Sequence, residues 1–248
     1  MSAARTRRGG IIEPTVFALA GIGVLVALGI WQLDRKAWKE NLIATVSARL
    51  NQPPQPLPAR ATWSSLTQAD NEYRRVAFTA QFLPGEEALV YTAGSAFRPD
   101  VQGPGYWVFE PARLAGGSIV IIDRGFVPFV GKGAAPHAAA PQGAVDIVGV
   151  MRWPDQRGLF TPADEPQNNV WYVRDPGLMA KALHWQDFAP FYIEQESPAP
   201  EGGLPKPGKL AVALPDNHLQ YAITWFGLAA GLAGVYLVWL KRRLGGRD

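Results

Sequence analysis

The sequence predicts a membrane protein with one transmembrane α-helix near each end and a mainly-β (α+β) extracytoplasmic domain between them. Two long apolar runs without charge occupy positions 15–33 and 219–240. Between them, short alternating apolar stretches are separated by clusters of glycine and proline, which is typical of strands joined by turns. Charged residues make up only 18% of the chain, fewer than in an average soluble protein.

The first apolar segment, Thr15–Leu33, is nineteen residues long, enough for a helix to cross the hydrocarbon core of a bilayer. A secretory signal peptide is the rival interpretation, because Arg5, Arg7 and Arg8 precede the segment. However, the run is too long for a signal peptide, and it ends in Trp31–Asp34 without a small-residue cleavage site. We expect a retained anchor. A mitochondrial presequence would need a longer Arg/Ser-rich leader, so a bacterial envelope protein is the simpler interpretation.

The second apolar segment, Leu219–Leu240, is followed at once by the basic run Lys241–Arg243. Tyr221 and Trp239 stand near its two ends, as aromatic residues at membrane interfaces often do. A buried core helix is the alternative. The length of the uncharged run favours a second transmembrane helix.

Charge predicts the orientation of both segments. The tails 1–14 and 241–248 hold seven Lys and Arg residues against two acidic ones, whereas 34–218 is nearly neutral, with 17 basic and 19 acidic residues. The positive-inside rule therefore places both termini in the cytoplasm and the domain 34–218 in the periplasm of a bacterial inner membrane. Arg35, Lys36 and Lys39 argue weakly against this, but long domains translocate largely regardless of charge. The pI of 9.2 reflects the tails and does not indicate nucleic-acid binding.

The domain is predicted to form an antiparallel sheet or a small barrel. Val76, Phe78, Ala80 and Phe82 alternate on one face of the first strand, and the β-branched run Ile119–Ile122 indicates a central strand. The candidate strands are Arg75–Phe82, Glu87–Ala93, Tyr106–Pro111, Ser118–Phe126, Val145–Met151, Val170–Val173 and Phe191–Glu194.

Helical and irregular segments complete the domain. Trp38, Leu42, Val46 and Leu50 recur at helical spacing, so the first helix is expected to continue past the membrane until Pro53-Pro54, before an extended connector at 52–58. A short helix is predicted at Pro176–Leu183, with Asp175 as N-cap. The Pro/Gly-rich stretch Ser197–Gly208 is expected to be a linker back to the membrane.

The residue inventory argues against an enzyme. The chain has no cysteine, which excludes disulfides, thiolate metal sites and a cysteine nucleophile. It also lacks a phosphate-binding glycine loop, a nucleophile elbow and paired histidines at metal spacing. Asp164 and Glu165 lie beside prolines and are expected to be solvated turn residues. Of the three histidines, His137 is expected to be solvent-exposed and His184 to cap the short helix.

His218 is the remaining histidine, and it stands where the second apolar segment begins. Asp216 and Asn217 before it are suitable N-cap residues. On a helical wheel, His218 shares a stripe with Trp225, Ala229, Leu232 and Tyr236, while Gly227, Gly231 and Gly234 occupy the opposite side. The glycine side would suit close packing against a neighbouring helix. The histidine side would suit a planar cofactor, because imidazole is a common axial ligand of haem iron. Alternatively, His218 simply reaches toward water at the membrane edge.

Several motifs resemble the surfeit-locus family of cytochrome c oxidase assembly proteins. The second-span signature Asn217–Phe226 (NHLQYAITWF) is the most specific. Leu28–Lys39 (LGIWQLDRKAWK) resembles the family's first span. Arg74–Val76, Gly105–Trp107, Asp123–Pro128 and Asn168–Tyr172 resemble its domain motifs, in the family's order.

This resemblance implies a non-enzymatic role in maturing haem–copper oxidase, with haem a bound transiently for the catalytic subunit. The family's haem-associated residues correspond to His218, as axial ligand of the haem iron, and Trp225, against the macrocycle or its tail. The haem a synthesis machinery is a further expected partner, together with the lipid bilayer. The alternative is a membrane scaffold that holds an oxidase assembly intermediate without binding haem. A membrane-anchored hydrolase is disfavoured by the missing nucleophile and base.

Overall fold

The computed structural model describes residues 6–95, 97–131, 133–211 and 216–245. The chain divides into two compact units: residues 1–44 with 215–248, and Thr45–Leu214. The first unit is helical and the second is built mainly of strands. The predicted order of helix, β-rich domain and helix is thus confirmed.

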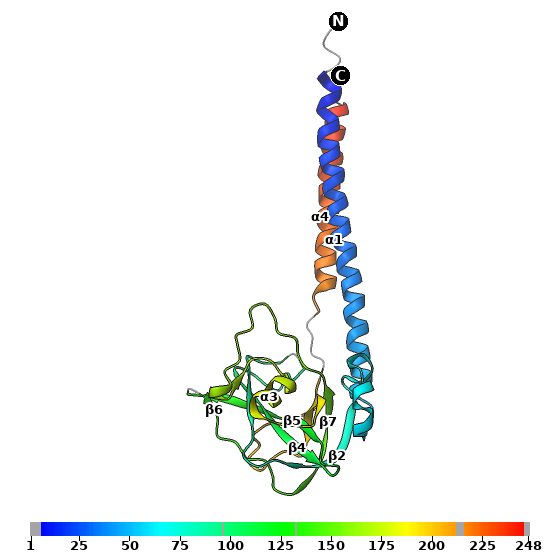
Figure 1. The fold of residues 1–248 in the computed structure, drawn as a ribbon. Coiled ribbons are helices and arrows are strands. Elements are labelled where there is room, and N and C mark those ends of the chain that lie inside the picture. The colour runs from blue at the N-terminus through cyan, green and yellow to red at the C-terminus, as the bar shows by residue number, and fades with distance from the viewer. Residues whose placement is uncertain (1–5, 96, 132, 212–215, 246–248) are drawn as a thin grey trace. The chain divides into compact units, whose positions relative to one another are not determined.

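The helical unit consists of α4 (His218–Gly245) and most of α1 (Thr6–Leu50), which run antiparallel to each other (Figure 1). Thr15 near the start of α1 bonds Tyr236 near the end of α4, at 2.7 Å between the hydroxyl oxygens. Both helices are long and apolar enough to cross a membrane, and only 6% of the most apolar stretch of each is buried. Large apolar side chains therefore point away from the helix pair, for example Phe17 (78% exposed) and Val235 (70% exposed).

The second unit is organised around a closed five-stranded barrel. Its strands follow one another around the barrel in the order β2–β4–β5–β9–β7, and pairing of β7 with β2 closes the ring. All neighbours are antiparallel except β5 and β9, which are parallel. The barrel strands are β2 (Arg75–Phe82), β4 (Gly105–Leu114), β5 (Ile119–Val130), β7 (Ala144–Arg152) and β9 (Phe188–Ser197).

Shorter elements extend the barrel on its outside. β1 (Gln55–Pro56) pairs with β2, β3 (Ala88–Thr92) with β4, β8 (Val170–Trp171) with β3, and β6 (Gly133–Ala134) with β5. The helical segments are η1 (Arg60–Ser65), α2 (Gln68–Asn71), η2 (Pro166–Asn168) and α3 (Pro176–Leu183). The side chain of Asp175 accepts from the backbone N–H groups of Gly177 and Leu178, which confirms it as the N-cap of α3.

Two buried layers hold the barrel together. The inner layer takes residues from all five barrel strands, including Val76, Ala112, Ile122, Ile147 and Phe191. The outer layer lies where α3, β3 and β8 cover the sheet, and it includes Trp107, Ile121, Trp171, Met179 and Tyr192. Neighbouring residues of β5 and of β9 thus belong to different layers. The continuous run Ile119–Ile122, predicted to form a central strand, is buried on both faces of β5.

The stretch Ser197–Gly208 is not the free linker that its composition suggests. Lys206 and Phe126 exchange both backbone hydrogen bonds, and Gly208 N–H donates to the carbonyl of Gln195. A prediction from proline and glycine content fails here because the non-proline residues Lys206 and Gly208 still have the backbone N–H groups that bond to β5 and β9. Backbone hydrogen bonds thus hold this stretch against β5 and β9.

Candidate functional site

His218 is the first residue of α4, and backbone hydrogen bonds fix its position there. Its N–H donates to the Oδ1 of Asp216 at 3.0 Å, and Tyr221 N–H donates to the carbonyl of Asn217. The expected capping of this helix start is therefore present, with Asp216 as the residue whose side chain accepts. The imidazole is half-buried.

The ring of His218 contacts α1 through Gln32. The Nδ1 atom lies 2.7 Å from the side-chain oxygen of Gln32, a hydrogen-bond distance. Because an amide oxygen only accepts, this contact is a hydrogen bond in the tautomer that carries its proton on Nδ1, and that tautomer has its lone pair on Nε2. Among the residues that the structure describes, none makes a hydrogen bond to Nε2. The contact with Gln32 thus orients the ring, with Nε2 on the side away from Gln32.

The stripe that contains His218 is the face of α4 that packs on α1. Ala222 and Ala229 are buried, and a Cβ placed on Gly21 of α1 would lie 3.1 Å from Leu232. Trp225 shares this face and is half-buried. It stands seven residues after His218, about two helical turns along the axis.

The glycine side of α4 was expected to pack closely against a neighbouring helix. If that neighbour is taken to be α1, the prediction is wrong. A Cβ placed on Gly227, Gly231 or Gly234 would meet nothing within 4 Å. The close-packing glycines belong to α1 instead, where Gly29 faces the ring of Phe226. Packing of the glycine side of α4 against another protein stays a prediction. A helical wheel separates two faces of a helix but cannot say which of them meets the neighbour.

The other two histidines lie in the barrel unit. His184 is the C-cap of α3, as predicted, in the left-handed conformation with φ 62°. His137 is not solvent-exposed as expected. Its Nε2 lies 3.2 Å from the carboxylate of Glu87 and its Nδ1 lies 3.0 Å from the carbonyl of Ala135. Both ring nitrogens of His137 therefore face oxygen atoms of the barrel unit.

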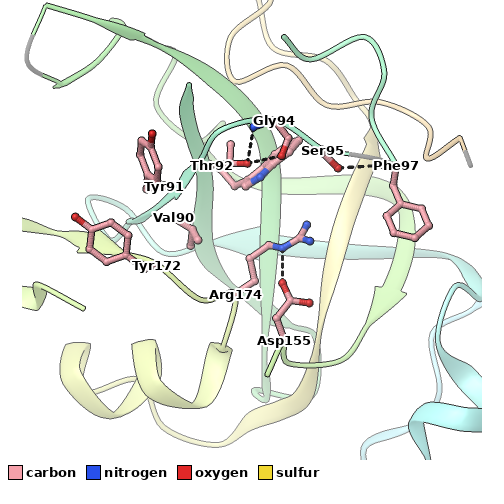
Figure 2. Close-up of a pocket in the computed structure, with 10 residues that line it drawn as sticks. Val90, Tyr91, Thr92, Gly94, Ser95, Phe97, Asp155, Tyr172 and Arg174 are labelled. Atoms are coloured by element: carbon pink, nitrogen blue, oxygen red, sulfur yellow. Dashed lines mark hydrogen bonds and ion pairs between the residues drawn. The ribbon is translucent and has the colours of Figure 1, made fainter. Parts of the chain in front are cut away.

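The barrel unit carries a pocket of about 330 Å³ beside the ends of β3 and β8 (Figure 2). Arg174 and Asp155 form an ion pair in it, with 2.9 Å between Nε and Oδ2. Tyr91, Tyr172 and Phe97 contribute aromatic walls. This combination suits a small polar or aromatic group. No residue lining the pocket is a histidine or methionine, so it provides neither of these two haem-iron ligands.

Buried charges close to this pocket are a structural feature that sequence analysis missed. Asp123 and Glu194 are cross-strand partners on β5 and β9, and both are almost fully buried. Burial, followed by the nearby charge of Glu194, raises the pKa of Asp123 to about 8. Arg152 pairs with Glu194 at 2.9 Å, and Arg174 lies 3.8 Å from the same carboxylate. The only available signal was the charged pair Asp123-Arg124 directly after a β-branched run.

Within the described residues, no group of three or more His, Asp or Glu side chains could hold a bare metal ion. A single imidazole such as that of His218 can instead serve as the protein ligand of a metal that a macrocycle already holds, as in haem proteins. His218 fits that role because its Nδ1 is engaged by Gln32 and, within the described residues, its Nε2 has no hydrogen-bond partner. Trp225 is half-buried on the same side of α4, and its contact with haem stays a prediction.

The fold and the site define a class of protein in which a β-barrel lies in the chain between two apolar helices and an oriented imidazole begins the second helix. The profile of the SURF1 family matches residues 19–230. A SURF1-like protein of Monosiga brevicollis is 34% identical over 99% of this chain and 94% of its own length. The chain belongs to the SURF1 family.

Two further relatives show how widely this similarity extends. Surfeit locus protein 1 of Homo sapiens is 32% identical over 88% of this chain and 74% of its own length. A SURF1-like protein of Rickettsia conorii is 28% identical and covers 88% of each chain. The resemblance predicted from the sequence is confirmed, and a bacterial relative exists.

Proposed function

We propose that this chain is an integral membrane assembly factor for haem–copper (cytochrome c) oxidase, which binds haem a through His218 and passes it to, or retains it for, the catalytic subunit. Membership of the SURF1 family supports the assembly role. The observation that carries the haem part is the hydrogen bond from His218 Nδ1 to Gln32, since it leaves Nε2 free to coordinate iron.

Membrane insertion is part of this proposal, and the surface of the helical unit supports it. Exposed apolar side chains cover both helices, among them Phe17, Val24, Ile223 and Val235. A surface of this kind is unfavourable in water and favourable in lipid. The basic tails favour an orientation with both termini in the cytoplasm and the barrel on the periplasmic side of a bacterial inner membrane.

Three residues have roles in the proposed haem binding: His218, Asp216 and Trp225. Haem a, when bound, supplies the redox-active iron that the oxidase requires. His218 donates one nitrogen to it, and Asp216 fixes the backbone from which the imidazole extends. Trp225 offers apolar contact area two turns further along α4. Because only one half-buried residue would bind the iron, haem could be released again. A haem carrier needs this release as well as binding.

The scaffold alternative also rests on specific observations. The stripe expected to hold the macrocycle packs on α1 instead, and the barrel has an aromatic pocket of its own. An absorption spectrum of the full-length protein, purified from cells that synthesise haem a, separates the two functions. The haem-carrier proposal predicts a Soret band and α band in proportion to protein. A preparation that stabilises oxidase intermediates and lacks these bands would favour the scaffold.

A further inference from the structure

Gln32 stands out because it is a polar residue at the end of an apolar segment. It belongs to the run Thr15–Leu33, where a polar side chain is unfavourable unless its hydrogen-bonding groups are satisfied. Its side-chain oxygen lies 2.7 Å from His218 Nδ1, across 186 residues of sequence. A polar residue in such a segment points to a function when its partner is itself a candidate ligand.

The helix pair holds Gln32 in place independently of this hydrogen bond. Gly29 lies three residues earlier on α1, on the same side of the helix, and packs directly against Phe226 of α4. Ala222, one turn after His218, is buried in the same interface. The contact between Gly29 and Phe226 therefore sets the register of the two helices, and this register brings Gln32 to the imidazole.

We propose that Gln32 is a positioning residue for His218: it fixes the tautomer with the proton on Nδ1 and aims Nε2 at the haem iron. This inference rests on the haem-carrier function proposed above. Outer partners of a ligating histidine orient the ring and tune its basicity. A neutral amide raises that basicity less than a carboxylate would. Gln32 thus favours a bond strong enough to hold haem and weak enough to give it up.

Three variants of the full-length protein test this role. Gln32→Leu removes the acceptor, and Gln32→Glu replaces it with a stronger one. Gln220→Leu is the matched control, because Gln220 is an exposed glutamine two residues after His218. Far-UV circular dichroism and expression level show whether each variant retains its helices.

The first measurement needs no haem. Nitrogen-15 NMR of histidine-labelled apo-protein reports which ring nitrogen carries the proton, and the His218→Ala spectrum assigns the signals. We expect His218 to be protonated on Nδ1 in the unmodified chain and in Gln220→Leu, and to shift toward the Nε2–H tautomer in Gln32→Leu. An unmodified chain with the proton mainly on Nε2 would overturn the inference, whether or not haem binds.

The second measurement follows haem affinity and the reduction potential of the iron. We expect Gln32→Leu to weaken haem binding about 10- to 100-fold and to raise the potential, and Gln32→Glu to keep haem and lower the potential. A merely structural role would not move the two potentials in opposite directions. Unchanged affinity and potential in Gln32→Leu would contradict the inference while the haem-carrier function stands. If the unmodified chain binds no haem, the proposed function and the haem role of Gln32 are both wrong.

Discussion

Gly29 of α1 lies directly against Phe226 of α4, so closely that a Cβ added to the glycine would stand 2.6 Å from the ring atom Cε1. No ordinary side chain fits at that distance. The contact lies between the pair Gln32–His218 and the pair Thr15–Tyr236, which bond the helices at either end. The arrangement of the candidate ligand therefore depends on a glycine in the other helix.

Gly29→Leu should separate the two helices at this point, because the larger side chain overlaps the ring of Phe226. The chain has no cysteine, so thiols introduced by Gly21→Cys and Leu232→Cys can be cross-linked without background. We expect the cross-linking yield to fall severalfold with Gly29→Leu. Gly23→Leu is the control, since a Cβ there would meet nothing within 4 Å. Equal yields in the two variants would refute the packing.

Gly231→Leu should leave the helix pair intact, because the glycine side of α4 does not face α1. We expect the same cross-linking yield and haem content as in the unmodified chain. If a helix of the oxidase packs on this side, the amount of co-purifying oxidase subunit should fall. A loss of cross-linking between α1 and α4 would show that the glycine side has been placed wrongly.

The buried carboxylate of Asp123 should make the barrel less stable as the pH rises from about 4 to about 8. The pKa of Asp123 is raised to about 8 by burial, whereas an unfolded aspartate titrates near its ordinary value of 3.8. In this window the unfolded chain has lost the proton and the folded chain keeps it. The free energy of unfolding therefore decreases by up to about 1.4 kcal/mol per pH unit from this group.

Asp123→Asn tests whether the free energy of unfolding decreases with pH because of this carboxyl group. The amide oxygen of the variant can still accept from Gly125 N–H, as Asp123 does at 3.0 Å. We expect the variant to gain stability relative to the unmodified chain as the pH rises through the window. Chemical denaturation of the detergent-solubilised protein at pH 5 and pH 8, followed by tryptophan fluorescence, provides the comparison. A difference in stability that does not change with pH would show that Asp123 is ionised in the folded state.

Reporter fusions test the proposed orientation. Pro141 lies in an exposed loop before β7, and Leu244 lies at the end of α4. A reporter active only outside the cytoplasm should be active at Pro141 and inactive at Leu244, because the basic tails favour the cytoplasmic side. Cytoplasmic activity at Pro141 would mean that Arg35, Lys36 and Lys39 dominate the topology instead.

Local sequence patterns predicted the elements of this fold well. The alternation of Val76, Phe78, Ala80 and Phe82 predicted β2 at Arg75–Phe82, and the Asp175 cap predicted α3 at Pro176–Leu183, both with the observed bounds. Periodicity and capping are local properties, so a single sequence displays them. The extension of the first helix to Leu50 was predicted for the same reason.

Pairing between distant segments was beyond these patterns. Closure of the barrel through β2 and β4, and the parallel pairing of β5 with β9, join strands whose register no local signal encodes. The same limit explains the site. His218 could be predicted because it lies beside an apolar run. Its partner Gln32 stands 186 residues away in the sequence, and no local pattern indicates that the two side chains meet.

The most direct test of the haem-carrier proposal is to measure the haem content of His218→Ala, purified at full length from cells that synthesise haem a. His218 begins a helix and is only half-buried, so the variant should insert at normal levels and lose most of its haem. Trp225→Ala should lose part of it, since contact area is removed while the metal bond remains. A well-expressed His218→Ala protein with unchanged haem content and an unshifted spectrum would contradict the claim that His218 binds the iron.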